Sequence, residues 1–125
     1  KNDVVYYQAL TGRTMYSIPA ASLRNFTVTD SALASQIKIV GETGSSDGII
    51  FGPDEKIYTS ALEYDAIRRT TPHGKVETVV QDEAIAWPDS FSIGPDNWLY
   101  FTTARIHEGA NPQGRYGLYR IKLPE

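Results

Sequence analysis

The sequence predicts an all-β fold, part of a β-propeller, and three observations carry this prediction. The phrase "SDGIIFGPDEKIYTS" at residues 46–60 returns as "WPDSFSIGPDNWLYFT" at 87–102, with matching residues 42 positions apart. A repeat of about 42 residues suits one four-stranded propeller blade. The apolar residues alternate with period two, or run as short β-branched and aromatic stretches, instead of recurring at helical spacing.

The predicted elements follow one another in short steps separated by turn sequences such as "TGR", "GPDE", "PHGK" and "GPDN". The first unit contains the segments "VVYYQAL", "RTMYSIP" and "IKIV", with a short helix over Pro19–Asn25 before the last of them. The middle unit has strands at 48–51, 57–60, 66–71 and 76–81. The third has strands near 90–93, 98–102 and 116–122. We therefore divide the chain into blade units at about 1–44, 45–86 and 87–125, which together make about two and a half blades.

Two and a half blades that do not close into a ring would leave the apolar faces of the two terminal blades uncovered. Each blade is apolar on both flat sides and needs a neighbour on each, and a soluble monomer rarely exposes such large apolar patches. The chain also begins with Lys1 and not with methionine. We expect either that the chain is part of a larger, closed propeller, or that a second copy or a partner chain supplies the missing blades.

Composition excludes several classes of function. The net charge of −3 is spread over interspersed acids and bases, so we expect no nucleic-acid binding and no polybasic membrane anchor. No apolar run is long enough to span a bilayer. The absence of cysteine rules out disulfides and thiolate metal sites, and it leaves the compartment open.

Blade geometry places the candidate chemistry at one rim. Asp47 and Asp89 precede the innermost strands of their blades, and the connections Ala61–Asp65 and Ala104–Arg115 share that rim. Two carboxylates that converge on a channel repel each other unless a cation or a proton lies between them. Oxygen ligands suit a hard divalent cation such as Ca²⁺ or Mg²⁺, so Asp47 and Asp89 are candidate metal ligands. The alternative is that both are ordinary turn formers.

Other residues divide into candidates for the site and candidates for the structure. Asp89 and His107 are the catalytic candidates, although a lone histidine on a long loop is more often incidental. The expected ligand-binding rim consists of Trp87, Arg105, Glu63 and Asp65, and Arg105 either holds an anionic substrate or bridges to a carboxylate.

The remaining repeated residues are predicted to be structural. We expect Asp54 and Asp96 to form hairpin turns at the opposite rim. We expect Tyr58, Trp98, Tyr100 and Phe101 to lie in the core between blades, and Arg68 and Arg69 to lie on the surface.

Two families share these motifs. "VVYYQALTGRTMYSIPAASLRN", "SDGIIFGPDEKIYTSAL" and "WPDSFSIGPDNWLYFTTARIHEG" resemble successive blades in the C-terminal part of the major royal jelly protein / Yellow family. This resemblance implies a six-bladed propeller about three times as long as this chain. It alone favours a secreted or periplasmic protein. Ala104 stands where that family often has asparagine, so a role for that amide does not carry over.

A more distant resemblance is to the senescence-marker / gluconolactonase propellers. Their Ser-Asn-Gly and Pro-Asp-Gly motifs bind a divalent metal. Asp47 stands in place of that asparagine, Asp89 matches the aspartate, and Ser90 replaces the glycine. The resemblance implies a third ligand, a glutamate from a blade outside this sequence.

These observations support three hypotheses about function. The first is a Yellow-like propeller that binds a small molecule in its axial channel. The second is a metal-dependent, lactonase-like hydrolase that uses Asp47 and Asp89, in which a metal polarises a carbonyl or activates water. The third is a non-catalytic propeller fragment that assembles with a second chain. Because propellers host unrelated activities, the fold alone does not decide between them.

Overall fold

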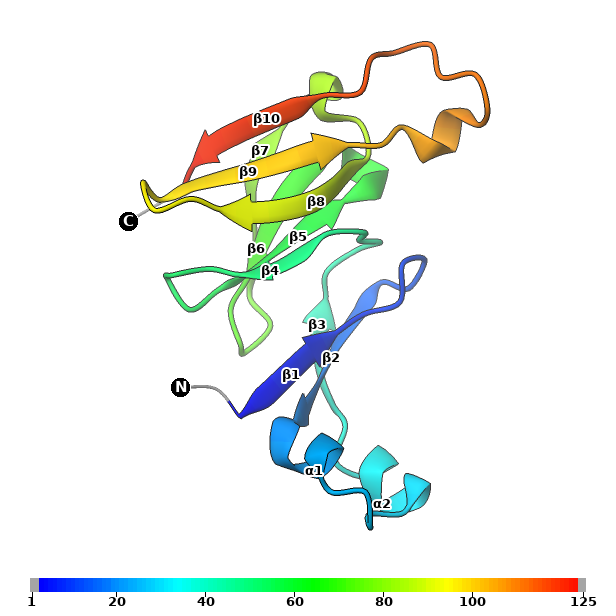
Figure 1. The fold of residues 1–125 in the computed structure, drawn as a ribbon, viewed down its shortest axis with the longest axis vertical. Helices are drawn as coiled ribbons and strands as arrows, with labels where there is room; N and C mark the ends of the chain where they lie inside the picture. Colours follow the sequence, from blue (N-terminus) through cyan, green and yellow to red (C-terminus); the bar gives the residue numbers. More distant parts are fainter. Residues whose placement is uncertain (1–2, 124–125) are drawn as a thin grey trace.

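Three small antiparallel β-sheets make up the chain in a computed structural model, which describes residues 3–123 (Figure 1). The predicted all-β fold is therefore confirmed. The first sheet has the order β1-β2-β3, from β1 (Val4–Tyr7), β2 (Thr14–Pro19) and β3 (Lys38–Glu42). The second has the order β4-β5-β6-β7, from β4 (Ile49–Phe51), β5 (Ile57–Ala61), β6 (Ala66–Thr70) and β7 (Val76–Gln81). The third has the order β10-β9-β8, from β8 (Pro88–Ile93), β9 (Trp98–Thr103) and β10 (Leu118–Lys122).

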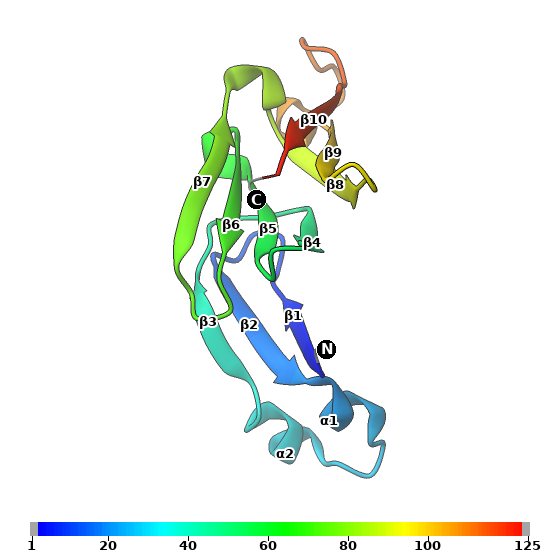
Figure 2. The ribbon, with the colours of Figure 1, turned by 90° about the vertical axis from the view of Figure 1, so that its left-hand side faces the viewer.

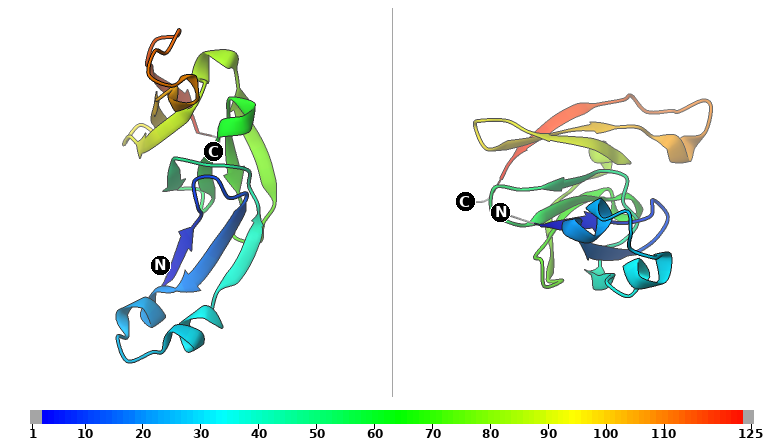
Figure 3. Two further views of the ribbon diagram at one scale, coloured as in Figure 1. Left: turned by 90° about the vertical axis from the view of Figure 1, so that its right-hand side faces the viewer. Right: turned by 60° about the horizontal axis from the view of Figure 1, so that its bottom comes forward.

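The sheets follow one another like consecutive blades. Figure 2 shows β1, β4 and β8 along one side of the molecule, with β3 and β7 along the other. The second sheet has four strands. The first and third have three each, and each of the three sheets lies within one of the blade units defined above. Viewed from the opposite side and from below, the same succession of sheets is visible (Figure 3).

The repeated phrase "GPDxxxY" builds the same hairpin twice. Tyr58 donates a hydrogen bond from its hydroxyl to Oδ2 of Asp54 (2.9 Å), and its ring lies against Gly52, where a Cβ would overlap it. The equivalent turn of the third sheet repeats both contacts, with Tyr100, Asp96 and Gly94. The turn residues Glu55 and Asn97 both have positive φ, at 60° and 61°. The recurrence of Asp54 and Asp96 therefore has a structural cause.

The main core lies between the second and third sheets. Tyr58, Ile67, Leu99 and Phe101 are buried there, which confirms the prediction for Tyr58 and Phe101. The prediction was wrong for Trp98 and Tyr100. Because strand residues alternate between faces, these two point away from the core that Leu99 and Phe101 enter, and they are only half-buried.

Arg68 and Arg69 were expected to lie on the surface, but both side chains are partly buried and contact other residues of the second blade unit. The Arg68 guanidinium lies 4.1 Å from the centre of the Tyr64 ring. The Arg69 side chain is only 19% exposed and forms ion pairs with Asp54 and Glu77. Strand periodicity gives the direction of a side chain but not the partners that a neighbouring turn supplies.

Short helices connect the strands. The predicted helix over Pro19–Asn25 is present as α1 (Ala20–Arg24), and α2 (Asp30–Ala34) follows it, unpredicted. Single turns form η1 (Leu62–Tyr64), η2 (Glu83–Ile85) and η3 (Ile106–Glu108). Among the described residues, no helix is long and apolar enough to span a membrane.

Candidate binding site at the axial rim

The inner strands of the second and third sheets begin with the same arrangement. In the second sheet the Ser60 hydroxyl accepts hydrogen bonds from the backbone N–H groups of Asp47 (2.8 Å) and Gly48 (3.0 Å). In the third sheet the Thr102 hydroxyl accepts from the N–H of Ser90 (3.3 Å). Ser60 and Thr102 are 42 residues apart, as are Gly48 and Ser90. In each of these two sheets, a hydroxyl on the second strand (Ser60 of β5 or Thr102 of β9) thus holds the backbone at or next to an aspartate. We call the end of the sheets at which Asp47 and Asp89 lie the axial rim.

Glycine is required between the two blades at this rim. A Cβ on Gly48 would overlap the carbonyl oxygen of Asp89, so the backbones of β4 and β8 approach as closely as glycine permits. The pairing of β8 with β9 shifts register between Pro88 and Phe91, which places Asp89 and Ser90 in a bulge. Bulges of this kind redirect side chains and are frequent beside functional sites.

Asp47 is bound by the next blade. The indole Nε1 of Trp87 donates a hydrogen bond to Oδ2 of Asp47 (2.9 Å). The other side of the contact is aromatic, because the Trp87 and His107 rings stack with centroids 5.7 Å apart and planes 7° apart. Trp87 has a φ of 52°, a left-handed conformation that is unusual for a bulky residue. Asp47, Trp87 and His107 therefore form one continuous group, which we call the rim triad.

Asp89, the other candidate ligand, lies in the bulge beside this group. Its Oδ1 accepts a hydrogen bond from the Ser90 hydroxyl (3.1 Å). Its backbone carbonyl is the group that covers Gly48. Asp89 is half-buried, as is Asp47.

Arg105 bridges to a carboxylate, the second of its two expected roles. It forms an ion pair with Glu108, and this guanidinium is the main cause that lowers the pKa of the Glu108 carboxyl. Oε2 of Glu108 also accepts the backbone N–H of Gln113 (2.5 Å), and Gly114 packs directly on the guanidinium. The pair thus folds the long β9–β10 connection on itself, and it places His107 Nε2 3.7 Å from Glu108.

Glu63 and Asp65 contribute to the rim in a different way. Glu63 forms a two-pronged ion pair with Arg13 of the first sheet, and the hydrogen bond to that guanidinium lowers the pKa of Glu63. Asp65 ends η1 with a φ of 46°, and its carbonyl accepts the N–H of Asp82 (3.0 Å). Neither contacts the rim triad through a hydrogen bond or ion pair. Glu63 joins the second sheet to the first, and Asp65 joins two connections within the second blade unit, so neither converges on Asp47.

The carboxylates at the axial rim are too few to complete the coordination of a divalent cation. Ca²⁺ takes six to eight oxygen ligands, whereas no group of three or more His, Asp or Glu side chains suited to a metal occurs among residues 3–123. Asp47 also has one oxygen committed to Trp87. Asp47 and Asp89 would therefore supply only two of the carboxylates that such an ion needs, and the others would come from outside these residues.

The rim triad was missed as a unit, although each of its members was singled out from the sequence. Trp87 and His107 are 20 residues apart in irregular segments, so no periodicity brings them together. One signal was available: a tryptophan directly before "PD" at the rim has an indole N–H that needs an acceptor when it is partly buried.

Comparisons with known proteins show the fold and no more. No family model matches the chain, and no curated protein matches it. Among solved structures it is similar to a gluconolactonase from Xanthomonas campestris, with a TM-score of 0.70 at 15% identity over 94% of this chain and 39% of that one. It is also similar to virginiamycin B lyase from Staphylococcus aureus, with a TM-score of 0.58 at 16% identity over 98% of this chain and 38% of that one.

A third similar structure is in the nidogen/laminin complex, with a TM-score of 0.58 at 12% identity, over 92% of this chain and 43% of that one. These matches identify the three sheets as consecutive blades of a propeller of the six-bladed type. The chain spans about two-fifths of the length of the proteins it matches. A gluconolactonase, a lyase and a chain of the nidogen/laminin complex share the fold, so the fold assigns no activity.

Proposed function

We propose that this chain is the part of a β-propeller that binds a small, hydroxylated molecule at the axial rim. The observation that carries the proposal is the rim triad, in which a tryptophan in a left-handed conformation stacks on His107 and binds Asp47. Strained backbone of this kind persists where surrounding contacts hold it, and it is concentrated at binding and active sites.

The chemistry of the triad suits such a ligand. A carboxylate oxygen accepts hydrogen bonds from hydroxyl groups, and an indole–imidazole stack gives a flat surface beside it. The Yellow-like sequence motifs support the same kind of function, since that resemblance implies a ligand in the axial channel. The similar X. campestris protein is a gluconolactonase, so aldonolactones are among the ligands to be tried first.

The two tryptophans allow a direct test. In a Trp98→Phe variant, Trp87 is the only indole, and its fluorescence should change in a saturable way when an aldonolactone or the corresponding sugar acid is added. In the matched Trp87→Phe variant only Trp98 remains, on a sheet face away from the rim, and its emission should stay constant. Equal responses in the two variants would contradict binding at the rim.

A metal-dependent hydrolase is the second candidate, and one observation favours it. The backbone at Asp47 and the backbone next to Asp89, at Ser90, are held at equivalent strand starts by the equivalent hydroxyls of Ser60 and Thr102, as expected for two ligands of one ion. A cation held there would polarise a lactone carbonyl. Water would then add to the carbonyl carbon, the ring C–O bond would break, and the released oxygen would take up a proton, for which His107 is the candidate donor.

The hydrolase candidate is separable from simple binding. Elemental analysis of purified protein should find a divalent metal that is lost in both Asp47→Asn and Asp89→Asn, and lactone hydrolysis followed by pH-stat should fall in parallel. Ligand-dependent fluorescence from Trp87 in metal-free protein without hydrolysis would leave the binding function and exclude this candidate.

A further inference from the structure

We infer that two copies of this chain associate head to tail, each third sheet packing on the first sheet of the other copy, and close one six-bladed ring. The occupant of the uncovered apolar face of the first sheet is then the third sheet of a second copy. Four observations lead to this inference, and only its consequence for the ligand site rests on the proposed function.

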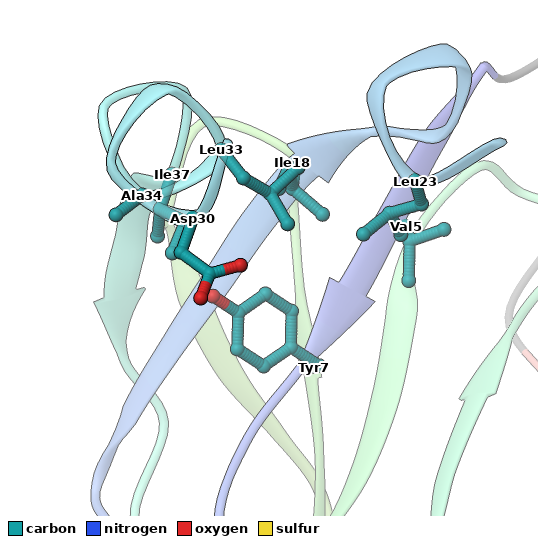
Figure 4. Close-up of a pocket in the computed structure, with 8 residues that line it drawn as sticks. All are labelled: Val5, Tyr7, Ile18, Leu23, Asp30, Leu33, Ala34 and Ile37. Carbon is teal, nitrogen blue, oxygen red and sulfur yellow. The ribbon is translucent and has the colours of Figure 1, made fainter. Parts of the chain in front are cut away.

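The first observation is an apolar groove on the first sheet (Figure 4). It has a volume of about 490 Å³ and lies on the face that points away from the second sheet. Strand alternation separates the two faces, because Val4 and Tyr6 line the side toward β4 while Val5 and Tyr7 line this groove. The floor and walls are mainly aliphatic: Val5, Ile18, Leu23, Leu33 and Ile37. Apolar area of this kind on a sheet face indicates an interaction surface.

The second observation is the opposite end of the molecule. The third sheet turns Tyr119 and Ile121 toward the core, so Leu118, Arg120 and Lys122 lie on its other face with Trp98. Leu118 is 74% exposed there. The Arg120 guanidinium covers the Trp98 ring at 4.5 Å from its centre. This face combines an aromatic surface, an exposed leucine and two positive charges.

The third observation is complementary charge. Asp30, at the start of α2, is the only acidic side chain of the groove, and its carboxylate points toward the Tyr7 hydroxyl in Figure 4. Arg120 and Lys122 carry the opposite sign on the face expected to meet it. Complementary charges at the edge of an apolar contact fix its register and reject mismatched partners.

The fourth observation is geometric. The chain matches a six-bladed type of propeller over 94% of its own length and 39% of the matched chain, and its three sheets correspond to three of the six blades of a full ring. A head-to-tail contact closes into a ring when the rotations add up to a full circle. Two copies satisfy this condition with two identical interfaces.

Closure has a consequence for the axial rim. Each copy brings one Asp47 and one Asp89, and a twofold ring sets the two pairs facing each other across the channel. The carboxylates that a divalent cation lacks within one chain would come from the second copy. The site is incomplete in a monomer.

The experiment compares three leucine-to-lysine variants of the full 125-residue chain by size-exclusion chromatography with light scattering. The unmodified chain should have a mass of about 28 kDa, twice the 13.9 kDa of one chain. Leu23→Lys in the groove and Leu118→Lys on the third sheet should each raise the concentration at which dimers dissociate by about tenfold or more. Leu10→Lys, in the β1–β2 connection, is the matched control, because Leu10 is 45% exposed and Leu23 is 42% exposed. Leu10 does not line the groove, so this variant should remain dimeric.

Each possible result supports or contradicts the head-to-tail dimer. A folded monomer at micromolar concentration, verified by circular dichroism, overturns the inference. A mass that keeps growing beyond that of a dimer as the concentration rises would contradict a closed ring of two copies. A dimer that persists in both Leu23→Lys and Leu118→Lys would contradict packing of the groove on the third sheet. Because Leu23 lies in α1 of the first blade unit and Leu118 lies in β10 of the third, misfolding of one variant leaves the other informative. A dimer without ligand at the rim contradicts the proposed function alone, whereas a monomer whose Trp87 still reports ligand contradicts the ring alone.

Discussion

The Trp87 indole donates its hydrogen bond to Asp47 across the boundary between two blades, over 2.9 Å and 40 residues of sequence. The contact links the beginning of the third blade unit to the beginning of the second. It also fixes the orientation of the aspartate that opens the inner strand. The hydrogen bond between Trp87 and Asp47 at the axial rim therefore both holds neighbouring blades together and shapes the candidate site.

Trp87→Phe tests the structural part of this contact. The phenyl ring keeps an aromatic surface beside His107 but loses the indole N–H, so the free energy of unfolding should fall by about 1.5–3 kcal/mol, the usual range for a hydrogen bond to a charged group. Urea unfolding at one fixed protein concentration measures it. Trp98→Phe removes the other indole, which has no hydrogen bond among residues 3–123, and should change the unfolding free energy less.

Gly48→Ala tests the closest approach of β4 and β8. The added methyl group would meet the carbonyl oxygen of Asp89, so the two blades must move apart, at a cost of about 1–3 kcal/mol in stability. Gly12→Ala is the matched control, because its Cβ would lie 3.3 Å from that of Ala9 and requires only a small local shift. Equal unfolding midpoints for the two variants would show that the blades are not in contact at Gly48.

The paired hairpins allow the same substitution in two environments. Tyr58 is fully buried and donates to Asp54 over 2.9 Å, and burial, followed by the bond to Asp54, raises the pKa of its hydroxyl. Tyr58→Phe should lower the unfolding free energy by about 1 kcal/mol. Tyr100→Phe removes a longer bond (3.3 Å) in an exposed position and should stay within about 0.5 kcal/mol of the unmodified chain. The ranking would reverse if the third sheet, and not the second, held the better-packed hairpin.

The sequence was sufficient to predict most of the strands, because their evidence is local. Alternation and turn residues located β5 and β7 within a residue of their observed bounds. The helix α2 was missed although Thr29, whose hydroxyl accepts the N–H of Ala32, and Asp30 are ordinary helix-start residues. Residues 30–34 lie inside the first repeat unit, where the repeat predicts strands and not a second helix.

The candidate site could be predicted only by position. Equivalent places in two blades put Asp47 and Asp89 at one rim, and this required no side-chain information. The partners depend on non-local packing: the indole bond of Trp87, the stack of His107 and the ion pair between Arg105 and Glu108. No spacing rule joins residues in irregular connections, since their backbone has no fixed period.

The last prediction concerns the pH dependence of stability at Glu77. Its carboxylate lies 2.7 Å from Nζ of Lys75 and 2.9 Å from Nε of Arg69, and these hydrogen bonds lower its pKa from 4.5 to about 2. Because the pKa is lower in the folded state, the charged carboxylate stabilises the fold above about pH 4.5. This contribution is lost as the pH falls from about 4.5 to about 2. Glu77→Gln should therefore lower the melting temperature at neutral pH, and the difference from the unmodified chain should shrink steadily over that interval. Glu83→Gln, in the exposed turn η2, provides the control, since Glu83 forms no ion pair within the described part of the chain. A difference that stays constant down to pH 2 would mean that the ion pairs of Glu77 do not stabilise the folded state.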